Sequence, residues 1–236
     1  MIILKASTSA EKGPHADRKR RGFLVTFEGI GGSGKSTLAV FAAQWLSRNG
    51  VPITTTREPG STSLGSALRT LLLTGKDREA PSPWAEAFLF EADRAQAYAR
   101  VIEPALTAGR VVVSDRNFYG TIAYQVFGRG LDLKLIQAMS RAAMAGRYPD
   151  LILVVDIDPM VGLGRKAGST ERDRFDEQKL AFQEAARKGF LWAAKRDPGL
   201  AIVLDGSKPL DELKEQVRDQ LGQLMGAQYP QIRSGP

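Results

Sequence analysis

Short apolar runs bounded by turn residues recur along the chain and predict β-strands. The runs lie at 23–28, 52–56, 111–115, 151–156 and 201–204. Helical patterns fill the intervals between them, and this alternation is typical of a parallel sheet covered by helices on both faces. The pattern therefore predicts a three-layer α/β fold with a five-stranded parallel sheet, whose ligands bind at the carboxyl ends of the strands.

A longer amphipathic pattern at 81–100 predicts a helix. Its apolar stripe includes Trp84, Ala87, Phe88 and Phe90, and Arg94 falls on the same face, four positions after Phe90. We expect this face to direct Arg94 at a ligand.

Residues 29–36 read GIGGSGKS and match the GxxxxGK[ST] phosphate loop between a predicted strand and a predicted helix. In such a loop, backbone N–H groups surround phosphate oxygens, and the next helix directs its positive N-terminal end at the same charge. Lys35 would reach the β- and γ-phosphates, and Ser36 would hold Mg²⁺. A chance match is expected in about 1% of chains this long. The loop predicts nucleotide binding but leaves GTPases, transport ATPases, helicases and small-molecule kinases open.

Composition limits the cellular setting. The chain has 236 residues, a length that suits one domain, and it contains no cysteine for disulfide or thiolate chemistry. No apolar run reaches the roughly 18 residues of a membrane helix, and the opening MIIL is too short for a signal-peptide core. These features predict a cytoplasmic protein without a membrane partner.

The net charge of +7 comes largely from the first 21 residues, which hold six Lys or Arg against two acidic residues. We interpret 1–21 as a disordered basic tail, so His15 within it receives no catalytic role. Nucleic-acid binding would rest on this tail alone and is not expected. The remaining chain is predicted to form one domain at 22–226, followed by a loose tail at 227–236.

Charged residues follow the predicted strands, where a ligand would bind. Catalysis of phosphoryl transfer consists mostly of positioning and of neutralising phosphate charge, so basic side chains are the candidates. A single arginine is more often a surface salt-bridge partner. Several at ligand-facing positions beside a phosphate loop instead favour a kinase, and these are Arg57, Arg94, Arg116, Arg165, Lys166, Arg172 and Arg174.

These motifs, in this order, resemble the thymidylate kinase family of P-loop nucleoside monophosphate kinases, which transfer the γ-phosphate of ATP to dTMP. The resemblance covers about 22–215 and rests on FEGIGGSGKST, TREPGSTSLGSALRTLLL, FLFEADR, SDRNFYGTIAYQ, GRG, PDLILVVDIDP, VGLGR and DRFDEQ. REPG combined with the phosphate loop and the DR pair is far more specific than any one motif. The sequence has no NKxD motif for reading guanine, which disfavours a GTPase.

The resemblance implies a donor site for ATP and Mg²⁺. Its residues would be Gly29, Ile30, Gly31, Gly32, Ser33, Gly34, Lys35, Ser36 and Thr37. Asp115 would approach the metal through water, with Glu58 near both metal and acceptor. Asp156 ends another apolar run and is the rival carboxylate. We prefer Asp115 because the arginine after it matches the family's DR pair.

The resemblance also implies an acceptor site for dTMP. Arg94 would bind the acceptor phosphate and Phe90 would stack on the base, since a guanidinium suits a phosphate and an aromatic face suits a pyrimidine. Ordinary core packing is the alternative for Phe90. The full acceptor set is Arg57, Glu58, Phe90, Arg94, Arg116, Thr121, Tyr124 and Gln125.

The segment at about 163–175 resembles the mobile lid of these kinases. One subtype carries an arginine in the phosphate loop, whereas this loop has Gly31, Gly32 and Ser33. The resemblance therefore implies that the lid delivers catalytic charge and that closure excludes water. The catalytic set would be Lys35, Arg116, Arg165, Arg172 and Arg174. A lid that is merely solvated is the alternative.

The sequence departs from the family in its acceptor contacts. Relatives usually carry an acidic residue at the position of Gly31, which approaches the sugar hydroxyl, and often a polar side chain at that of Gly120 or Ile122. Lost polar contacts weaken discrimination among bases, so a kinase for another pyrimidine or modified deoxynucleotide stays open. A regulator without turnover is the alternative from a different class. The resemblance implies a homodimer and transfer without a general base.

Overall fold

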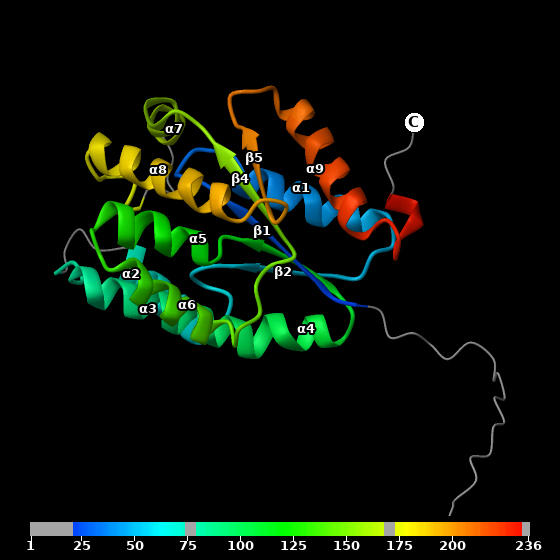
Figure 1. Ribbon diagram of the computed structural model, residues 1–236, viewed down its shortest axis with the longest axis horizontal. Coiled ribbons are helices and arrows are strands. Elements are labelled where there is room, and N and C mark those ends of the chain that lie inside the picture. The colour runs from blue at the N-terminus through cyan, green and yellow to red at the C-terminus, as the bar shows by residue number, and fades with distance from the viewer. Residues whose placement is uncertain (1–20, 74–78, 168–172, 233–236) are drawn as a thin grey trace, which may run out of the picture.

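The sheet at the centre of the fold has five parallel strands in the order β2-β3-β1-β4-β5. The computed structural model describes residues 21–73, 79–167 and 173–232 (Figure 1). The strands are β1 (Phe23–Glu28), β2 (Ile53–Arg57), β3 (Val111–Asp115), β4 (Leu151–Asp156) and β5 (Ala201–Asp205). They match the five predicted runs to within one residue at each end, so the predicted fold class is confirmed.

Helices cover both faces of the sheet (Figure 1). The longer ones are α1 (Lys35–Arg48), α2 (Ser63–Leu73), α3 (Pro83–Ala97), α6 (Leu133–Ala143), α7 (Pro159–Lys166), α8 (Leu180–Arg196) and α9 (Leu210–Met225). Shorter helical segments are η1 (Tyr98–Ile102), α4 (Glu103–Thr107), α5 (Phe118–Thr121), η2 (Ile122–Gly128) and η3 (Pro230–Ile232). Helix α3 continues directly into η1 and α4, and α5 continues into η2.

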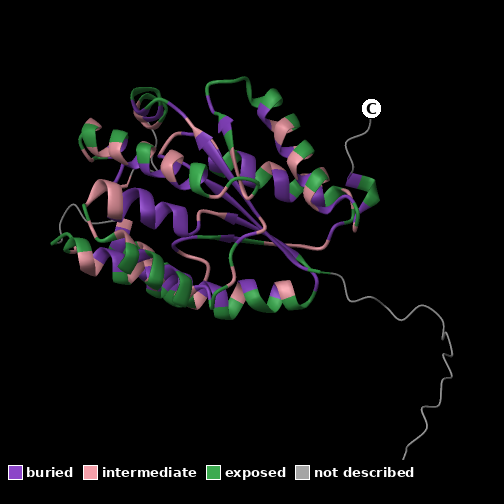
Figure 2. Cartoon of the chain, in the orientation of Figure 1, coloured by how far each residue is buried: buried purple, intermediate pink, exposed green. Residues whose placement is uncertain are grey.

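Alternate residues of each strand build two apolar cores. Phe23, Val25 and Phe27 of β1 pack with α1 and α9 on one face. Leu24 packs on the other face with η1, α5, η2 and α8. Figure 2 shows the sheet buried between the layers, with exposed positions on the outer sides of the helices. A strand buried on both faces reads as a continuous apolar run, which is why these strands are visible in the sequence.

The C-terminal segment is more ordered than predicted. Tyr229 and Ile232 are 1% and 0% exposed and belong to the core cluster formed with α1 and α9. The prediction of a loose tail from 227 is therefore wrong as far as residue 232, because these two side chains complete an apolar core. The predicted tail at 1–20 and residues 233–236 lie outside the described residues.

Helix α3 turns most of the predicted stripe inward. Ser82 caps its first turn by accepting a hydrogen bond from the N–H of Ala85 at 3.4 Å. Ala87 and Arg94 are buried, whereas Phe88 is 57% exposed and was misplaced by the prediction. The stripe also gave no sign that Glu91 is buried, because this carboxylate is paired with Arg94 on the inner face of α3.

Candidate functional site

A cavity of about 850 Å³ opens at the carboxyl ends of β1, β2 and β3. It brings together most of the side chains predicted for the site. Those lining it are Gly31, Lys35, Ser36, Arg57, Glu58, Phe90, Arg94, Asp115, Arg116, Thr121, Tyr124 and Gln125. They come from five separate segments of the chain, so the parallel sheet has gathered them as expected.

The phosphate loop connects β1 to α1 through residues in left-handed conformations. Gly32 and Gly34 have φ of 73° and 95°, which a residue with a side chain rarely adopts. Gly34 is the N-cap of α1, and no side chain caps this helix or places an acid in its first turn. Apart from the Lys35 N–H, which donates to the Ser33 hydroxyl at 3.4 Å, the first-turn N–H groups of α1 are thus left for an anionic ligand. Ser36 is exposed at this helix end, as is Thr37, which does not line the cavity.

Lys35 is 8% exposed and faces the cavity beside Arg116 and Asp115. Burial, together with the nearby charge of Arg116, lowers the pKa of its ammonium group to about 8, although the charge of Asp115 opposes this shift. Burying this positive charge is unfavourable because no nearby group fully compensates it. A bound phosphate would supply the missing negative charge.

Arg116 has a positive φ of 77°, an uncommon conformation for a residue other than glycine. Its N–H donates to the carbonyl of Phe27 at 2.9 Å, and its own carbonyl accepts from the Ser114 hydroxyl at 2.6 Å. Its guanidinium donates to the Gly29 carbonyl at 3.1 Å and to the Tyr124 hydroxyl at 3.3 Å. The backbone is held in a costly conformation that directs this cation to the phosphate loop.

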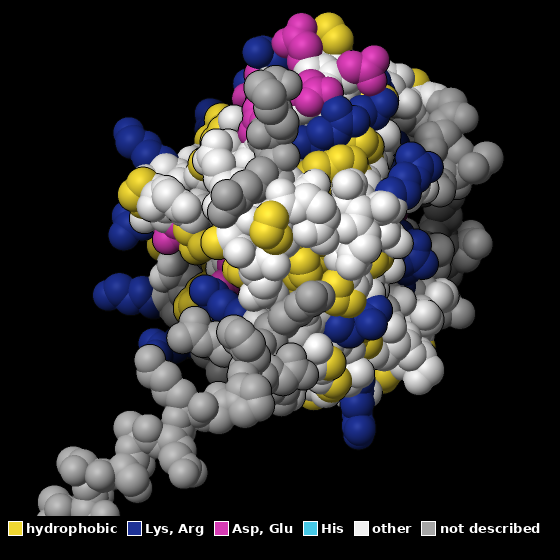
Figure 3. Space-filling model, turned by 90° about the vertical axis from the view of Figure 1, so that its right-hand side faces the viewer, with side chains coloured by type: hydrophobic (Ala, Val, Ile, Leu, Met, Phe, Trp, Pro, Cys, Tyr) yellow, Lys and Arg dark blue, Asp and Glu magenta, His cyan; other side chains and the backbone are white. Residues whose placement is uncertain are grey.

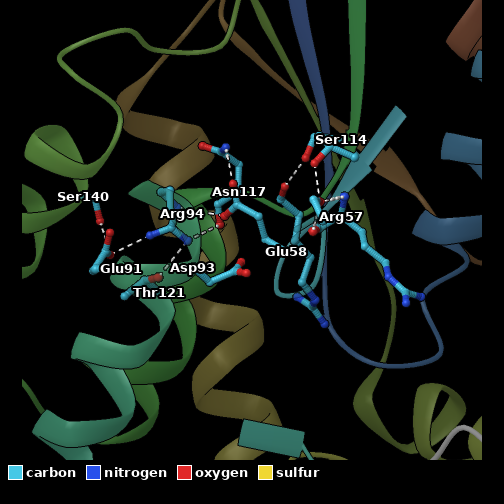
Figure 4. Close-up of polar contacts among 12 residues, drawn as sticks. Arg57, Glu58, Glu91, Asp93, Arg94, Ser114, Asn117, Thr121 and Ser140 are labelled. Carbon is cyan, nitrogen blue, oxygen red and sulfur yellow. Dashed lines mark hydrogen bonds and ion pairs between the residues drawn. The ribbon is translucent and has the colours of Figure 1, made fainter. Parts of the chain in front are cut away.

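Arg94 is surrounded by protein partners (Figure 4). Its Nε donates to Glu58 Oε2 at 2.9 Å, and its Nη1 lies 2.6 Å from Glu91 Oε1. Nη2 donates to the Asn117 carbonyl at 3.2 Å and to the Thr121 hydroxyl at 3.1 Å. Burial raises the pKa of Glu58 to about 7 although Arg94 lowers it. Arg94 thus fixes two carboxylates and the start of α5.

Arg57, Arg69 and Arg116 differ from Arg94. All three line the cavity, yet none forms an ion pair with a carboxylate among residues 21–73, 79–167 and 173–232. Burial lowers the pKa of Arg69, and the positive charge of Arg57 lowers it further. Neighbouring guanidinium groups that lack carboxylate partners are suited to an anionic ligand.

Sequence reasoning missed Glu28, the last residue of β1. It is completely buried, accepts from the Asn117 N–H at 2.8 Å, and has its other carboxyl oxygen, Oε2, without a partner in the described chain. Burial raises its pKa to about 8, against the opposing charge of Arg116. A glutamate that ends an apolar run immediately before the phosphate loop was the available signal.

The predicted base pocket has polar and aromatic walls. Thr121 and Gln125 are 2% and 1% exposed, and Gln125 donates to Glu86 Oε1 at 2.8 Å. Phe90 and Tyr124 each approach the ring of Phe175, with centroids 5.8 and 5.4 Å away. Gly120 lines the cavity, whereas Ile122 is buried in the apolar core. Polar partners for a base are therefore present despite these two departures.

The lid residues occupy different places. Arg165 donates to the carbonyls of Gly32 at 3.4 Å and Gly206 at 3.3 Å, beside the phosphate loop. Arg174 instead pairs with Glu86 at 2.6 Å and donates to the Leu72 carbonyl, away from the cavity lining. Arg172 lies outside the described residues. In the conformation described, only Arg165 of the two placed arginines is near the donor side.

The rival carboxylate has a structural partner. Asp156 accepts from Nε and Nη2 of Arg187 at 2.7 and 2.8 Å and does not line the cavity. Asp115 does line it, and its Oδ1 is buried without a partner in the described chain. No group of three potential side-chain ligands occurs among the described residues. Asp115 and the Ser36 hydroxyl therefore suit Mg²⁺, which keeps waters and phosphate oxygens as ligands.

Other surface features add little to a functional assignment. On the face shown in Figure 3, Lys and Arg side chains are scattered and stand beside acidic ones at one end. Within the described ranges, no helix has the length and apolar character to span a membrane.

Comparisons with known proteins agree with this geometry. The thymidylate kinase family profile matches residues 27–217. The thymidylate kinase of Desulfosudis oleivorans is 42% identical over 197 residues, covering 80% of this chain and 92% of that protein. That of Cereibacter sphaeroides strain ATH 2.4.9 is 44% identical over 199 residues, covering 82% and 91%. The crystal structure of thymidylate kinase from Ehrlichia chaffeensis superposes with a TM-score of 0.68 at 29% identity, covering 85% and 99%. The chain belongs to the thymidylate kinase family.

Proposed function

We infer that the protein transfers the γ-phosphate of ATP to dTMP, giving dTDP and ADP, which is the activity of its family. The observation that supports this most directly is the shared cavity, in which a phosphate loop faces unpaired arginines and a polar, aromatic base pocket. ADP formation with dTMP and competing monophosphates tests the inference.

The donor triphosphate binds the loop at 29–36, where the N–H groups of α1 and the Lys35 ammonium meet its β- and γ-phosphates. Arg165, beside the Gly32 carbonyl, adds positive charge on the donor side. Mg²⁺, when bound, neutralises charge on the phosphates, and Ser36 and Asp115 are the residues that would hold it. We keep Arg172 and Arg174 as lid candidates whose contribution depends on closure.

The acceptor phosphate is better matched to Arg57, Arg69 and Arg116 than to Arg94. These three guanidinium groups lack carboxylate partners in the described chain, whereas Arg94 is shared between Glu58 and Glu91. We therefore revise the sequence hypothesis for Arg94. It shapes the pocket that Thr121, Gln125 and Phe90 offer to the base.

Transfer then needs positioning more than acid–base chemistry. An ionised phosphate is already a nucleophile, and the cations on both sides hold donor and acceptor in line while neutralising the moving charge. We propose a cytoplasmic homodimer as well, following the family resemblance. Exposed apolar side chains on the neighbouring helices α2 and α3, Leu64, Leu71 and Phe88, offer a surface for it, which measurement of the mass in solution would test.

Replacing Arg94 with alanine should raise the KM for dTMP by about 10- to 100-fold while leaving the KM for ATP nearly unchanged. The pocket wall loses the group that fixes Glu58 and Thr121. Two buried carboxylates also lose their partner, so the free energy of unfolding should fall by about 3–5 kcal/mol. Steady-state kinetics with each substrate varied and a denaturation curve measure both effects.

The matched control is the exposed Arg100, six positions further along in η1, the segment that continues α3. Arg100→Ala should change neither KM nor stability. If Arg94→Ala altered only the KM for ATP, the acceptor would not occupy this side of the cavity.

ATP binding should weaken as pH rises above about 8, the pKa to which burial lowers Lys35 in the free protein. Bound phosphates favour the charged ammonium, so binding takes up a proton once Lys35 is neutral, and Kd rises up to tenfold per pH unit. In the ligand-free protein, the buried charge of Lys35 reduces the free energy of unfolding at pH values below this pKa. The reduction disappears as pH rises toward the ordinary pKa that Lys35 has in the unfolded chain. Calorimetric titrations between pH 7 and 9.5 measure the effect.

Lys35→Ala should bind ATP weakly and without this pH dependence. A Kd for the unsubstituted protein that stays constant across the range would contradict direct phosphate contact by Lys35.

A further inference from the structure

Position 31 of the phosphate loop and Asp176 compete for one space. A Cβ atom built on Gly31 would lie 2.1 Å from Oδ1 of Asp176, far inside van der Waals contact. A side chain at position 31 would therefore force the Asp176 carboxylate to move from the place it occupies. The glycine leaves the space that the Asp176 carboxylate fills.

Asp176 is held in place by the turn that contains it. Asp173 Oδ1 accepts from the N–H groups of Phe175 at 2.8 Å and Asp176 at 3.1 Å. Asp176 Oδ2 accepts from the Asp173 N–H at 3.3 Å and lies 3.4 Å from Lys166 Nζ. Asp176 is only 6% exposed. Its contacts within the described chain thus engage Oδ2 and leave Oδ1 beside the cavity.

The acceptor offers few donors to such an oxygen. With its phosphate ionised, dTMP can donate only from its 3′-hydroxyl and from N3 of thymine. The base side of the cavity is formed by Phe90, Thr121 and Gln125, whereas Asp176 lies against Gly31 in the phosphate loop. A carboxylate next to the loop is placed for the sugar, and a hydroxyl-to-carboxylate hydrogen bond is among the stronger ones.

We propose that Asp176 is a specificity-determining residue that accepts a hydrogen bond from the 3′-hydroxyl of the acceptor, in the space that a side chain at position 31 would fill. This inference rests on the proposed phosphorylation of dTMP. The recognising carboxylate then comes from the turn at the end of the lid instead of from the phosphate loop, so sugar recognition depends on the position of that turn.

The test compares dTMP with 3′-deoxythymidine monophosphate as acceptors. The unsubstituted protein should prefer dTMP by about 10- to 100-fold in kcat/KM. Asp176→Ala should reduce this preference to less than about threefold by lowering kcat/KM for dTMP alone. The exposed neighbour Glu177, which does not line the cavity, is the control, and Glu177→Ala should keep the full preference.

A second pair of variants tests the shared space. Gly31→Asp alone should impair turnover, because its side chain meets the Asp176 carboxylate. The same substitution in the Asp176→Ala background should restore the preference for the 3′-hydroxyl, since the carboxylate is supplied from the other side. If Asp176→Ala is poorly folded, Asp176→Asn, which keeps the size of the side chain and removes its charge, decides the question: it should lower kcat/KM for dTMP more than for the 3′-deoxy acceptor.

An unchanged preference in Asp176→Ala, or equal losses for both acceptors, would overturn the proposal, because a purely structural ion pair with Lys166 serves both acceptors alike. So would a double variant with no restored preference. If the unsubstituted protein failed to phosphorylate dTMP, the proposed function would fall. If it phosphorylated dTMP with a preference independent of Asp176, only the present proposal would fall.

Discussion

Replacing Lys35 with alanine is expected to lower kcat by about 10²- to 10³-fold, the loss seen when one preorganised charge-stabilising group is removed. Lys35 is buried at the start of α1 and faces the cavity, where burial has already lowered its pKa to about 8. The negative charge that moves between donor and acceptor would lose a buried cation that faces the cavity. Single-turnover rates with saturating MgATP and dTMP measure the chemical step directly.

Arg48 supplies the control for this experiment. It is exposed in the last turn of the same helix, so Arg48→Ala removes a positive charge from α1 without touching the cavity. Its kcat should equal that of the unsubstituted protein. Near-normal turnover in Lys35→Ala would contradict the assignment of residues 29–36 as the donor phosphate site.

Replacing Arg116 with glutamine should lower kcat/KM for dTMP by about 10²- to 10³-fold. The guanidinium lies between the Gly29 carbonyl and the Tyr124 hydroxyl and forms no ion pair with a carboxylate within the described ranges. No carboxylate therefore competes by direct contact with the acceptor phosphate, although Glu28 and Asp115 lie close enough to interact electrostatically with this guanidinium. Glutamine keeps much of the side chain's length. The decrease in kcat/KM therefore measures the effect of removing the positive charge and the several N–H donors of the guanidinium group.

Arg110 immediately precedes the opposite end of β3 and is exposed, where it donates to the Thr54 hydroxyl at 2.8 Å. Arg110→Gln should therefore leave kcat/KM unchanged. If Arg116→Gln reduced the melting temperature but not kcat/KM, Arg116 would serve only to neutralise the surroundings of Glu28.

The sheet was predictable because its strands are buried on both faces and read as continuous apolar runs. Helix α3 was harder, since Phe88 is exposed while Glu91 and Arg94 are buried. Apolar patterning assigns charged residues to solvent, and it fails where a helix borders a polar cavity. Arg94 is paired with Glu58, just after β2, and with Thr121 of α5, while Glu91 accepts from Ser140 of α6. Such long-range pairing leaves no periodic signal.

The site was predicted better as a set of residues than as a set of roles. Motif matching identified Arg94 and Arg116 together, but only the structure separates an arginine bound by two carboxylates from one without them. The departure at Gly31 looked like a missing contact in the sequence. The position of Asp176, 145 residues later in the chain, depends on the fold of the turn at the end of the lid.

Glu28 and Arg69 were missed for different reasons. Glu28 ends β1 and was counted with the strand, although its buried carboxyl group contacts the start of α5. Arg69 lies within α2, where an arginine in an amphipathic helix ordinarily indicates a solvated face. In the sequence, a role for Glu28 in the site is indicated only by the phosphate loop that follows it, and a role for Arg69 only by the REPG segment that precedes it.

The most direct test of the central claim is ADP formation by the purified protein with MgATP and a panel of acceptors: dTMP, dUMP, dCMP, UMP, CMP, dAMP and dGMP. We expect strong turnover with dTMP and a kcat/KM for dTMP well above that for every other acceptor. A higher kcat/KM for another acceptor, or ATP binding without turnover of any of them, would contradict it.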